Sequence, residues 1–260
     1  MRWYVVIFLL TQTVVQAQQE RADFEKFFTD HNVQGCFVCL DAGQNRYVRY
    51  NPERCRQAFL PASTFKILNS LIGLETGFIA DENYLIQWHW VERSIPSLNQ
   101  DHTLKSAMKH SVVWYYQELA RRVGVERMSA LVKESHYGNE DISDKIDTFW
   151  LEGALRISPD EQVGFLRRFY EFHLPFSRRS VEIVKSILLQ EENERYRLYA
   201  KTGWAVRTDR QIGWFVGFVE RDRSVYYFAT NIESSCKEAL FGPARIEISK
   251  AILRDLNILD

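Results

Sequence analysis

Apolar positions along the chain predict strands near both ends and helices between them. Residues 22–31 have the spacing of a short amphipathic helix, and residues 35–51 have the alternation of a β-hairpin with its turn at 41–45. Residues 61–77 return to helical spacing, and Gly77 stands where a helix would stop. The chain is therefore predicted to begin with a helix, a hairpin and a second helix.

The centre of the chain has helical spacing almost throughout. Ser158 followed by Glu161 is a capping signal at the start of one of these helices. The clearest helical segments are residues 103–124, 125–135, 158–172 and 181–190. A block of this length, in which helical patterns dominate, predicts a separate helical region.

The period of the pattern changes again after residue 195. Residues 196–206, 212–222 and 224–234 are rich in β-formers and separated by turn residues, which predicts three consecutive antiparallel strands. Residues 239–259 then close the chain as an amphipathic helix. This order predicts an α+β (mixed α/β) fold, with a central antiparallel sheet formed by both ends of the chain and flanked by terminal helices.

A length of 260 residues fits one large domain with a sizeable core. We expect a single domain over 18–260, with its sheet region at about 18–62 and 183–260, an inserted helical region at about 63–182, and a ligand cleft between them. Lys and Arg number 33 against 34 Asp and Glu, so the net charge is −1. This balance does not indicate a nucleic-acid-binding surface.

The first residues have the features of a secretory signal peptide. Arg2 precedes a short apolar run, and Val15 and Ala17 are small residues at the −3 and −1 positions of a cleavage site. A buried strand or an uncleaved anchor are the alternatives, although the run is short for a membrane span. We predict a signal peptide over residues 1–17 and export to the periplasm, or secretion from a host without an outer membrane.

The four cysteines do not indicate a metal site. Cys36 and Cys39 form a CxxC motif, which can indicate zinc or redox chemistry. The motif lies in a predicted strand, where residues three apart point to opposite faces, so the two thiols are not expected to meet at one ion. An exported protein permits disulfides, but the sequence does not say whether Cys36, Cys39, Cys55 and Cys236 form any.

The segment PASTFK, residues 61–66, places Ser63 and Lys66 three residues apart at the start of a predicted helix. On a helix the two side chains share one face, with their Cβ atoms about 5–6 Å apart. A lysine can take the serine's proton only if burial lowers its pKa, which the apolar neighbours Phe65 and Ile67 favour. A capped helix start with a surface lysine explains the same pattern, so this motif alone does not identify a nucleophile.

Further motifs follow in order along the chain. They are Ser111-Val112-Val113, Tyr137-Gly138-Asn139 and Lys201-Thr202-Gly203-Trp204. An SxxK motif with a later serine motif and KTG is the set found in serine β-lactamases and penicillin-binding proteins. In this order the motifs resemble those of the class D serine β-lactamases, the oxacillinases. The resemblance extends to LPASTFKI, HSVVW, KIDTFWLEGALRIS and FATNI, covers nearly the whole mature chain, and implies the serine β-lactamase fold.

The resemblance implies roles for four catalytic residues. Ser63 would attack the β-lactam carbonyl and form an acyl-enzyme. Lys66, N-carboxylated by carbon dioxide, would be the general base for acylation and deacylation, and no separate cofactor is implied. Trp150 would steady the carbamate through its indole N–H, with core packing as its alternative role. Ser111 would pass a proton toward the leaving nitrogen.

The resemblance also implies a set of substrate-binding residues. Lys201 and Arg245 would attract the substrate carboxylate, although Arg245 could instead be a solvated helix residue. The backbone N–H groups of Ser63 and Trp204 would form the oxyanion hole. The implied binding residues are Val113, Lys201, Thr202, Gly203, Trp204 and Arg245.

Two other functions share this chemistry. A penicillin sensor that stays acylated and a D,D-peptidase acting on cell-wall peptides both fit the motifs, whereas the length of the chain and the cleavable leader favour a β-lactamase. The histidines form no HxH or HExxH pattern and no GxSxG is present, so metallo-hydrolysis and a Ser-His-Asp triad are unsupported.

The substrate spectrum and the oligomeric state stay open at this stage. The spectrum depends on the geometry around Trp88, Trp114, Leu151 and the loop at 206–211. The expected partners are small-molecule β-lactams, without nucleic acid or, after cleavage, membrane. The family includes both monomers and homodimers.

Overall fold

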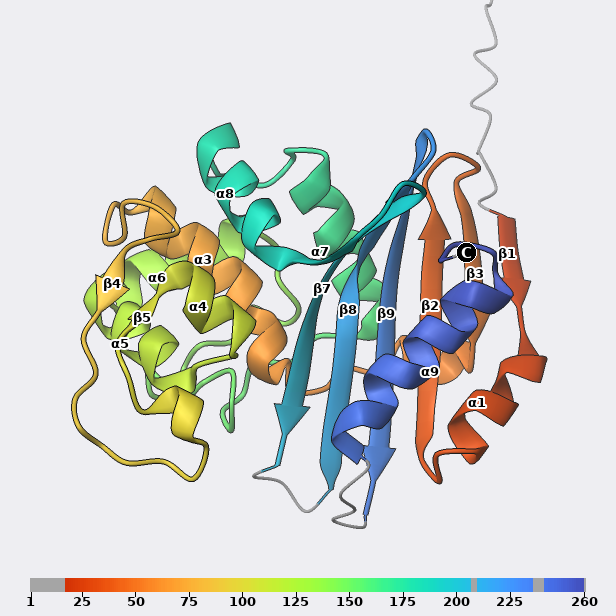
Figure 1. Ribbon diagram of the computed structural model, residues 1–260, viewed down its shortest axis with the longest axis horizontal. Coiled ribbons are helices and arrows are strands. Elements are labelled where there is room, and N and C mark those ends of the chain that lie inside the picture. The colour runs from red at the N-terminus through yellow and green to blue at the C-terminus, as the bar shows by residue number, and fades with distance from the viewer. Residues whose placement is uncertain (1–16, 207–209, 236–240, 260) are drawn as a thin grey trace, which may run out of the picture.

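A central sheet with helices on both faces forms the frame of the molecule (Figure 1). The computed structural model describes residues 17–206, 210–235 and 241–259. Within them the sheet has seven strands, in the spatial order β1 (Ala17–Glu20), β3 (Arg46–Tyr50), β2 (Gln34–Asp41), β9 (Ser224–Ser234), β8 (Gln211–Arg221), β7 (Tyr196–Ala205) and β6 (Leu189–Glu192). Apart from Ala17, the predicted signal peptide lies outside the described residues.

The two ends of the chain meet in the middle of this sheet. All eight residues of β2 pair antiparallel with β9, from Gln34 opposite Glu233 to Asp41 opposite Tyr226. The strands β7, β8 and β9 follow one another as an antiparallel meander. The predicted mixed fold, with one antiparallel sheet drawn from both ends, is therefore confirmed. The short β1 was not predicted, and it pairs parallel with β3.

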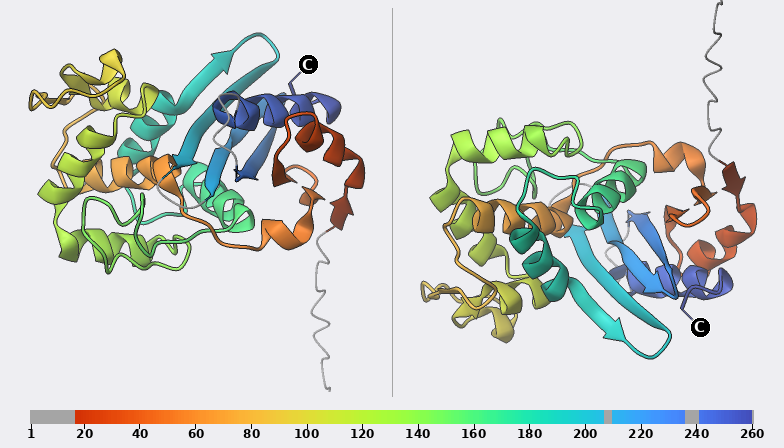
Figure 2. Two further views of the ribbon diagram at one scale, coloured as in Figure 1. Left: turned by 90° about the horizontal axis from the view of Figure 1, so that it is seen from below. Right: turned by 90° about the horizontal axis from the view of Figure 1, so that it is seen from above.

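Each face of the sheet packs on its own apolar core. The helices α9 (Phe241–Asp255) and α1 (Glu25–Thr29) cover one face, and α7 (Pro159–Tyr170) lies on the other (Figure 2). Cys36 belongs to the core on the α7 side and Cys39 to the core under α9. The two thiols of the CxxC motif therefore point to opposite faces, as the strand geometry predicts.

The cysteines that the structure describes are free and buried. Cys55 ends the short helix α2 (Pro52–Cys55), and its thiol lies close to the backbone carbonyl oxygens of Phe37 and Tyr50. Cys236 lies outside the described residues, so its pairing stays open.

The helical region packs beside the β7 end of the sheet (Figure 1). Its helices are η2 (Ala62–Phe65), α3 (Lys66–Glu75), η3 (Pro96–Leu98), α4 (Leu104–Lys109), α5 (Val113–Val123), α6 (Val125–Glu134) and α8 (Arg178–Leu188). A two-stranded ribbon of β4 (Leu85–Ile86) and β5 (His102–Thr103) was not predicted. Within the described part of the chain, no helix is both long and apolar enough to cross a membrane.

The segment 103–124, which has one continuous helical pattern, is divided at Ser111. Ser111 has a φ of 54°, which an α-helix cannot contain, so α4 ends before it and α5 starts after it. The pattern does not reveal the break, because Met108, Val112 and Trp114 are buried on both sides of it. The helix predicted at 181–190 begins three residues earlier in the structure, at Arg178, and ends two residues earlier, at Leu188, since Leu189 opens β6.

Candidate active site

Ser63 lies in η2, a single helical turn that leads directly into α3. Ala62 before it has a φ of 47°, a left-handed conformation that costs about 1–2 kcal/mol for a residue with a Cβ. The indole Nε1–H of Trp214 on β8 donates to the Leu60 carbonyl at 2.8 Å and anchors the approach to this turn. The serine is thus placed by a strained backbone that the sheet holds in position.

Lys66 is fully buried one turn after Ser63. Its Nζ lies 2.7 Å from Ser63 Oγ, 2.8 Å from the Ser111 carbonyl oxygen and 3.0 Å from Ser111 Oγ. Burial, and secondly the charge of Lys201, lower the pKa of Lys66 well below its usual range. A neutral amine within hydrogen-bonding distance of a serine hydroxyl can accept the proton of that hydroxyl.

Ser111 connects this lysine to a second one. Its left-handed backbone directs both the carbonyl and the hydroxyl to Lys66, and Lys201 Nζ donates to the same hydroxyl at 3.0 Å. Lys201 also donates to the carbonyl oxygen of Thr202 at 3.0 Å. One hydroxyl between two amines can relay a proton from one side of the site to the other.

The strand β7 passes close to the nucleophile because Gly203 has no side chain. A Cβ at this position would lie 3.0 Å from the Pro61 carbonyl oxygen and 3.0 Å from a Thr64 methyl group. The strand β6 pairs with β7 only at Arg197–Tyr199, so the part of β7 that carries Lys201 has no strand partner on its outer edge among the described residues. Beside Lys201 and Thr202, a cavity of about 210 Å³ lies between this edge, α4 and α9.

Arg245 approaches the site from α9. Its guanidinium lies 5.3 Å from the ring centre of Trp204, and its buried Nε and Nη1 atoms have no hydrogen-bond partner among the described residues. Burial lowers the pKa of Arg245 to about 10. Burial, and secondly the charge of Arg245, lower the pKa of Lys201 to about 7. Two neighbouring cations, of which Arg245 has unsatisfied donors among the described residues, form a place for an anion.

Trp150 packs against the nucleophile helix. It is fully buried and stacks on Phe65, the residue before Lys66, with 5.4 Å between ring centres. Its indole Nε1–H is buried without a partner among the described residues, which normally costs about 1–3 kcal/mol. Leu151 next to it is buried, and Val113 at the start of α5 is half-buried against the same core.

The Tyr137-Gly138-Asn139 motif holds the loop that carries Trp150. The phenol oxygen of Tyr137 lies 3.5 Å from Thr64 Oγ1 beside the nucleophile. Asn139 Oδ1 accepts from the Arg156 backbone N–H at 2.8 Å, and its Nδ2 donates to the Ala154 carbonyl at 3.0 Å. These contacts join the two ends of the loop, so the motif stabilises the loop that carries Trp150 and does not supply a reacting group.

Tyr116 also lies in the site, although no sequence motif identifies it. The Lys66 Nζ lies 5.4 Å from the centre of its ring, and the Tyr116 hydroxyl is 3.0 Å from Ser70 Oγ. Helical spacing from Val113, three residues earlier, is the one signal that could have found it. Its buried ring keeps water away from one side of the lysine.

The geometry places a serine, two lysines and an arginine at the junction of a sheet and a helical region, which defines the penicillin-binding class of serine enzymes. Accordingly, residues 12–256 match the family described as the penicillin binding protein transpeptidase domain. The chain is 44% identical over 246 residues to β-lactamase OXA-48 of Klebsiella pneumoniae, covering 95% of this chain and 92% of the relative. It belongs to the class D serine β-lactamases, a family of hydrolases.

Solved structures agree with this assignment. The crystal structure of a class D β-lactamase, YbXI from Nostoc, matches with a TM-score of 0.88 and 41% identity, covering 91% of this chain and 99% of that one. The C-terminal domain of the Bacillus licheniformis BlaR penicillin receptor also matches, with a TM-score of 0.88 and 34% identity, covering 94% and 98%. The fold is thus shared by hydrolases and by at least one receptor.

Proposed function

We propose that this chain hydrolyses β-lactam antibiotics through an acyl-enzyme on Ser63, with N-carboxylated Lys66 as general base, and so gives resistance to them. The observation that carries the proposal is the buried Lys66 amine, 2.7 Å from Ser63 Oγ, in the core where the indole N–H of Trp150, stacked on Phe65, has no partner among the described residues. Membership of a hydrolase family supports the reaction class.

Acylation follows from the hydrogen bonds around Ser111. The base on Lys66 takes the hydroxyl proton of Ser63 as Oγ bonds to the β-lactam carbonyl carbon. Backbone N–H groups of Ser63 and Trp204 hold the resulting oxyanion, where one donor is worth about 10²–10³ in rate in other enzymes. When the C–N bond breaks, Ser111 passes a proton to the nitrogen, since its hydroxyl contacts both Lys66 and Lys201 at 3.0 Å.

Lys201 on β7 and Arg245 on α9 would bind the substrate carboxylate. Within the described part of the chain, the Nε and Nη1 atoms of Arg245 have no hydrogen-bond partner, and Lys201 and Thr202 lie where β7 has no outer strand partner. An arginine fork suits a planar carboxylate. Burial, and secondly the charge of Arg245, lower the pKa of Lys201, and the substrate anion would offset both effects.

The residues around Lys66 fit a carbamate. Burial and secondly the charge of Lys201 lower the pKa of Lys66, which favours the neutral amine, the form that reacts with carbon dioxide. The carbamate would supply an anionic base for attack of water on the acyl-enzyme. Trp150 offers it a buried N–H donor with no other partner among the described residues. The Tyr116 ring, 5.4 Å from Lys66 Nζ, and Val113, which packs on the same core, would limit the access of bulk water to the lysine.

Turnover of benzylpenicillin tests the proposal. The purified protein should release hydrolysed product over many cycles and faster with added bicarbonate. Ser63→Ala should give no acyl adduct by mass spectrometry, and Lys66→Ala should lose turnover while still binding the drug. The receptor alternative rests on the match to the BlaR domain. It would be favoured if the wild-type adduct on Ser63 persisted undiminished with bicarbonate present.

We also propose that residues 1–17 direct export and are removed. The Arg2 start, the apolar run and the small residues at Val15 and Ala17 support this. The N-terminal sequence of the protein recovered from the periplasm or medium should begin at Gln18. An N-terminus at Met1 in that fraction would contradict cleavage.

A further inference from the structure

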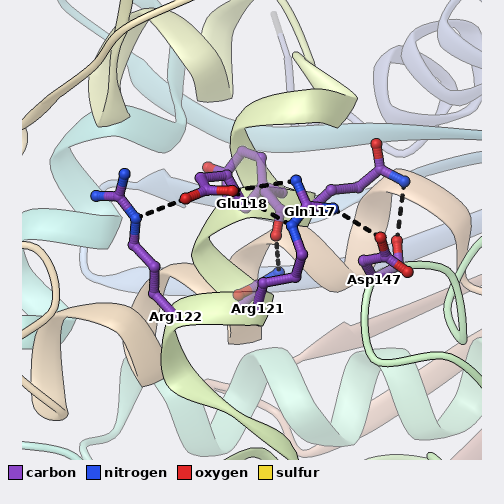
Figure 3. Close-up of polar contacts among 7 residues, drawn as sticks. Gln117, Glu118, Arg121, Arg122 and Asp147 are labelled. Carbon is purple, nitrogen blue, oxygen red and sulfur yellow. Dashed lines mark hydrogen bonds and ion pairs between the residues drawn. The ribbon is translucent and has the colours of Figure 1, made fainter. Parts of the chain in front are cut away.

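One face of α5 runs from the catalytic site to the turn that carries Trp150. Val113, Gln117 and Arg121 are spaced four residues apart, so they lie along one side of the helix. Val113 lies at the end of α5 that follows Ser111. One turn further along the helix, Gln117 Nε2 donates to the backbone carbonyl of Asp147 at 3.1 Å. Two turns from Val113, Arg121 Nη1 binds the Asp147 carboxylate at 2.6 Å (Figure 3).

The guanidinium of Arg121 is held in place by a second carboxylate. Its Nε and Nη2 donate to Glu118 Oε2 at 3.3 and 3.1 Å, and Arg122 donates to the other oxygen of Glu118 at 2.9 Å (Figure 3). Although burial opposes it, hydrogen bonding from Arg122 and Arg121 lowers the pKa of Glu118, which therefore stays charged at neutral pH. The two hydrogen bonds to Glu118 thus orient the Arg121 guanidinium toward Asp147.

Asp147 sits inside the compact turn that presents Trp150. The backbone N–H groups of Phe149 and Leu151 bond to the carbonyls of Lys145 and Thr148, at 3.0 and 2.8 Å. Because these bonds make the turn rigid, holding Asp147 fixes the position of the indole three residues later.

The base of the loop is attached elsewhere. Asp144 accepts from the Ala154 backbone N–H at 2.7 Å, and Asn139 binds Ala154 and Arg156. These bonds join the two strands of the loop to each other and not to α5. The polar contacts between the turn and the helix that carries Val113 are those of Asp147 with Gln117 and Arg121, among the residues the structure describes.

We infer that Gln117 and Arg121 form a clamp on Asp147 that sets the position of the Trp150 N–H and thereby the stability of the Lys66 carbamate. They are positioning residues, acting through Trp150, and the inference rests on the proposed function. The side chains of Gln117 and Arg121 bond to Asp147 and Glu118 and, among the described residues, to none of the proposed substrate-binding residues, so the clamp would control the occupancy of the general base without touching the antibiotic.

The fraction of Lys66 that is carboxylated at a given bicarbonate concentration tests the effect of the clamp. The double variant Gln117→Met, Arg121→Met keeps side-chain length and removes both contacts. Wild type and variant are depleted of carbon dioxide and titrated with ¹³C-bicarbonate, following the carbamate resonance of Lys66 and, separately, turnover. The half-saturating bicarbonate concentration should rise about tenfold, the factor that corresponds to the loss of one net hydrogen bond of about 1.4 kcal/mol.

A matched control and a coupling test separate positioning from general damage. Arg122→Met removes the neighbouring guanidinium from the same Glu118 without touching Asp147, and should leave the half-saturating concentration unchanged. Added to Trp150→Phe, the double variant should cause no further increase, since the clamp acts through the indole. Melting temperatures confirm that each variant is folded.

Three results would overturn the inference. One is a double variant within about twofold of wild type, and another is an increase that adds fully to that of Trp150→Phe. Either leaves the proposed function intact. A wild-type protein without any carbamate resonance would overturn the proposed base as well, so the two failures are distinguishable.

Discussion

At the scale of single residues, the site concentrates buried positive charge. Lys66, Lys201 and Arg245 have no carboxylate partner among the described residues, and each has a lowered pKa because burial penalises its charged form. Such an arrangement is unfavourable until anions arrive. The proposed function supplies two, the carbamate on one lysine and the substrate carboxylate beside the other.

The lowered pKa of Lys201 predicts a pH dependence of substrate binding. With a pKa of about 7, Lys201 loses its positive charge gradually as the pH rises through that value, whereas the penicillin carboxylate stays charged, so their attraction is lost over the same range. In the Ser63→Ala variant without carbon dioxide, the Kd for benzylpenicillin should increase about tenfold between pH 6 and pH 8.5 in calorimetric titrations. Adding Lys201→Arg should remove this dependence; an unchanged pH profile would contradict the assignment.

At the scale of elements, the sequence predicts what is periodic and misses what is not. The hairpin, the meander and the helices α3, α5 and α7 follow from apolar spacing. The break at Ser111 does not, because its backbone conformation is set by tertiary bonds to Lys66 and Lys201. The strands β4 and β5 have only two residues each, too few to show a period.

The residues of the candidate site likewise include some that the sequence predicts and some that it does not. Motifs identify the residues that contact one another directly, such as Ser63, Lys66 and Ser111. The clamp on Asp147 carries no local signal, since Gln117 and Arg121 are 30 and 26 residues from it and a surface pair of charges is common. Tertiary contacts of this kind become visible only in the folded chain.

Gly138 is the element-scale position where a side chain would do most damage. It has a φ of 57°, and a Cβ there would lie 1.9 Å from the Arg156 carbonyl oxygen. Gly138→Ala should lower the free energy of unfolding in urea by about 3 kcal/mol, from backbone strain and the clash together. Gly77→Ala is the matched control, because Gly77 has a φ of 74° with nothing within 4 Å, and should cost about 1 kcal/mol. Equal costs would refute the role of the Arg156 contact.

At the scale of the whole molecule, the active site exists only where the helical region meets the sheet. Near the nucleophile the two parts touch at Gly203 and through Trp214. At the other end of β8, Glu220 accepts hydrogen bonds from Tyr170 on α7 at 2.9 Å, Lys185 on α8 at 2.6 Å and Tyr199 on β7 at 3.2 Å. This carboxylate joins two helices to two strands far from the chemistry.

Glu220→Gln should therefore weaken the junction without altering the site. Although burial opposes it, hydrogen bonds from Lys185 and Tyr170 lower the pKa of Glu220, so its contribution is present at neutral pH and is lost as the pH falls below the ordinary range of a carboxyl group. In urea at pH 7 the variant should lose about 2 kcal/mol of unfolding free energy, because Lys185 keeps its charge at a half-buried position.

The difference between variant and wild type should shrink on acidification, since protonation removes the same charge from the native protein. Lys185→Met should have a smaller cost at pH 7, because Glu220 then keeps both tyrosine hydrogen bonds and a second cation, Arg197, whose Nη1 lies 3.7 Å from its Oε2. The turnover rate of benzylpenicillin should change less than about twofold in either variant, because the site-forming contacts at Gly203 and Trp214 remain. A large loss of turnover in a folded Glu220→Gln protein would mean that this distant junction also sets the geometry around Ser63.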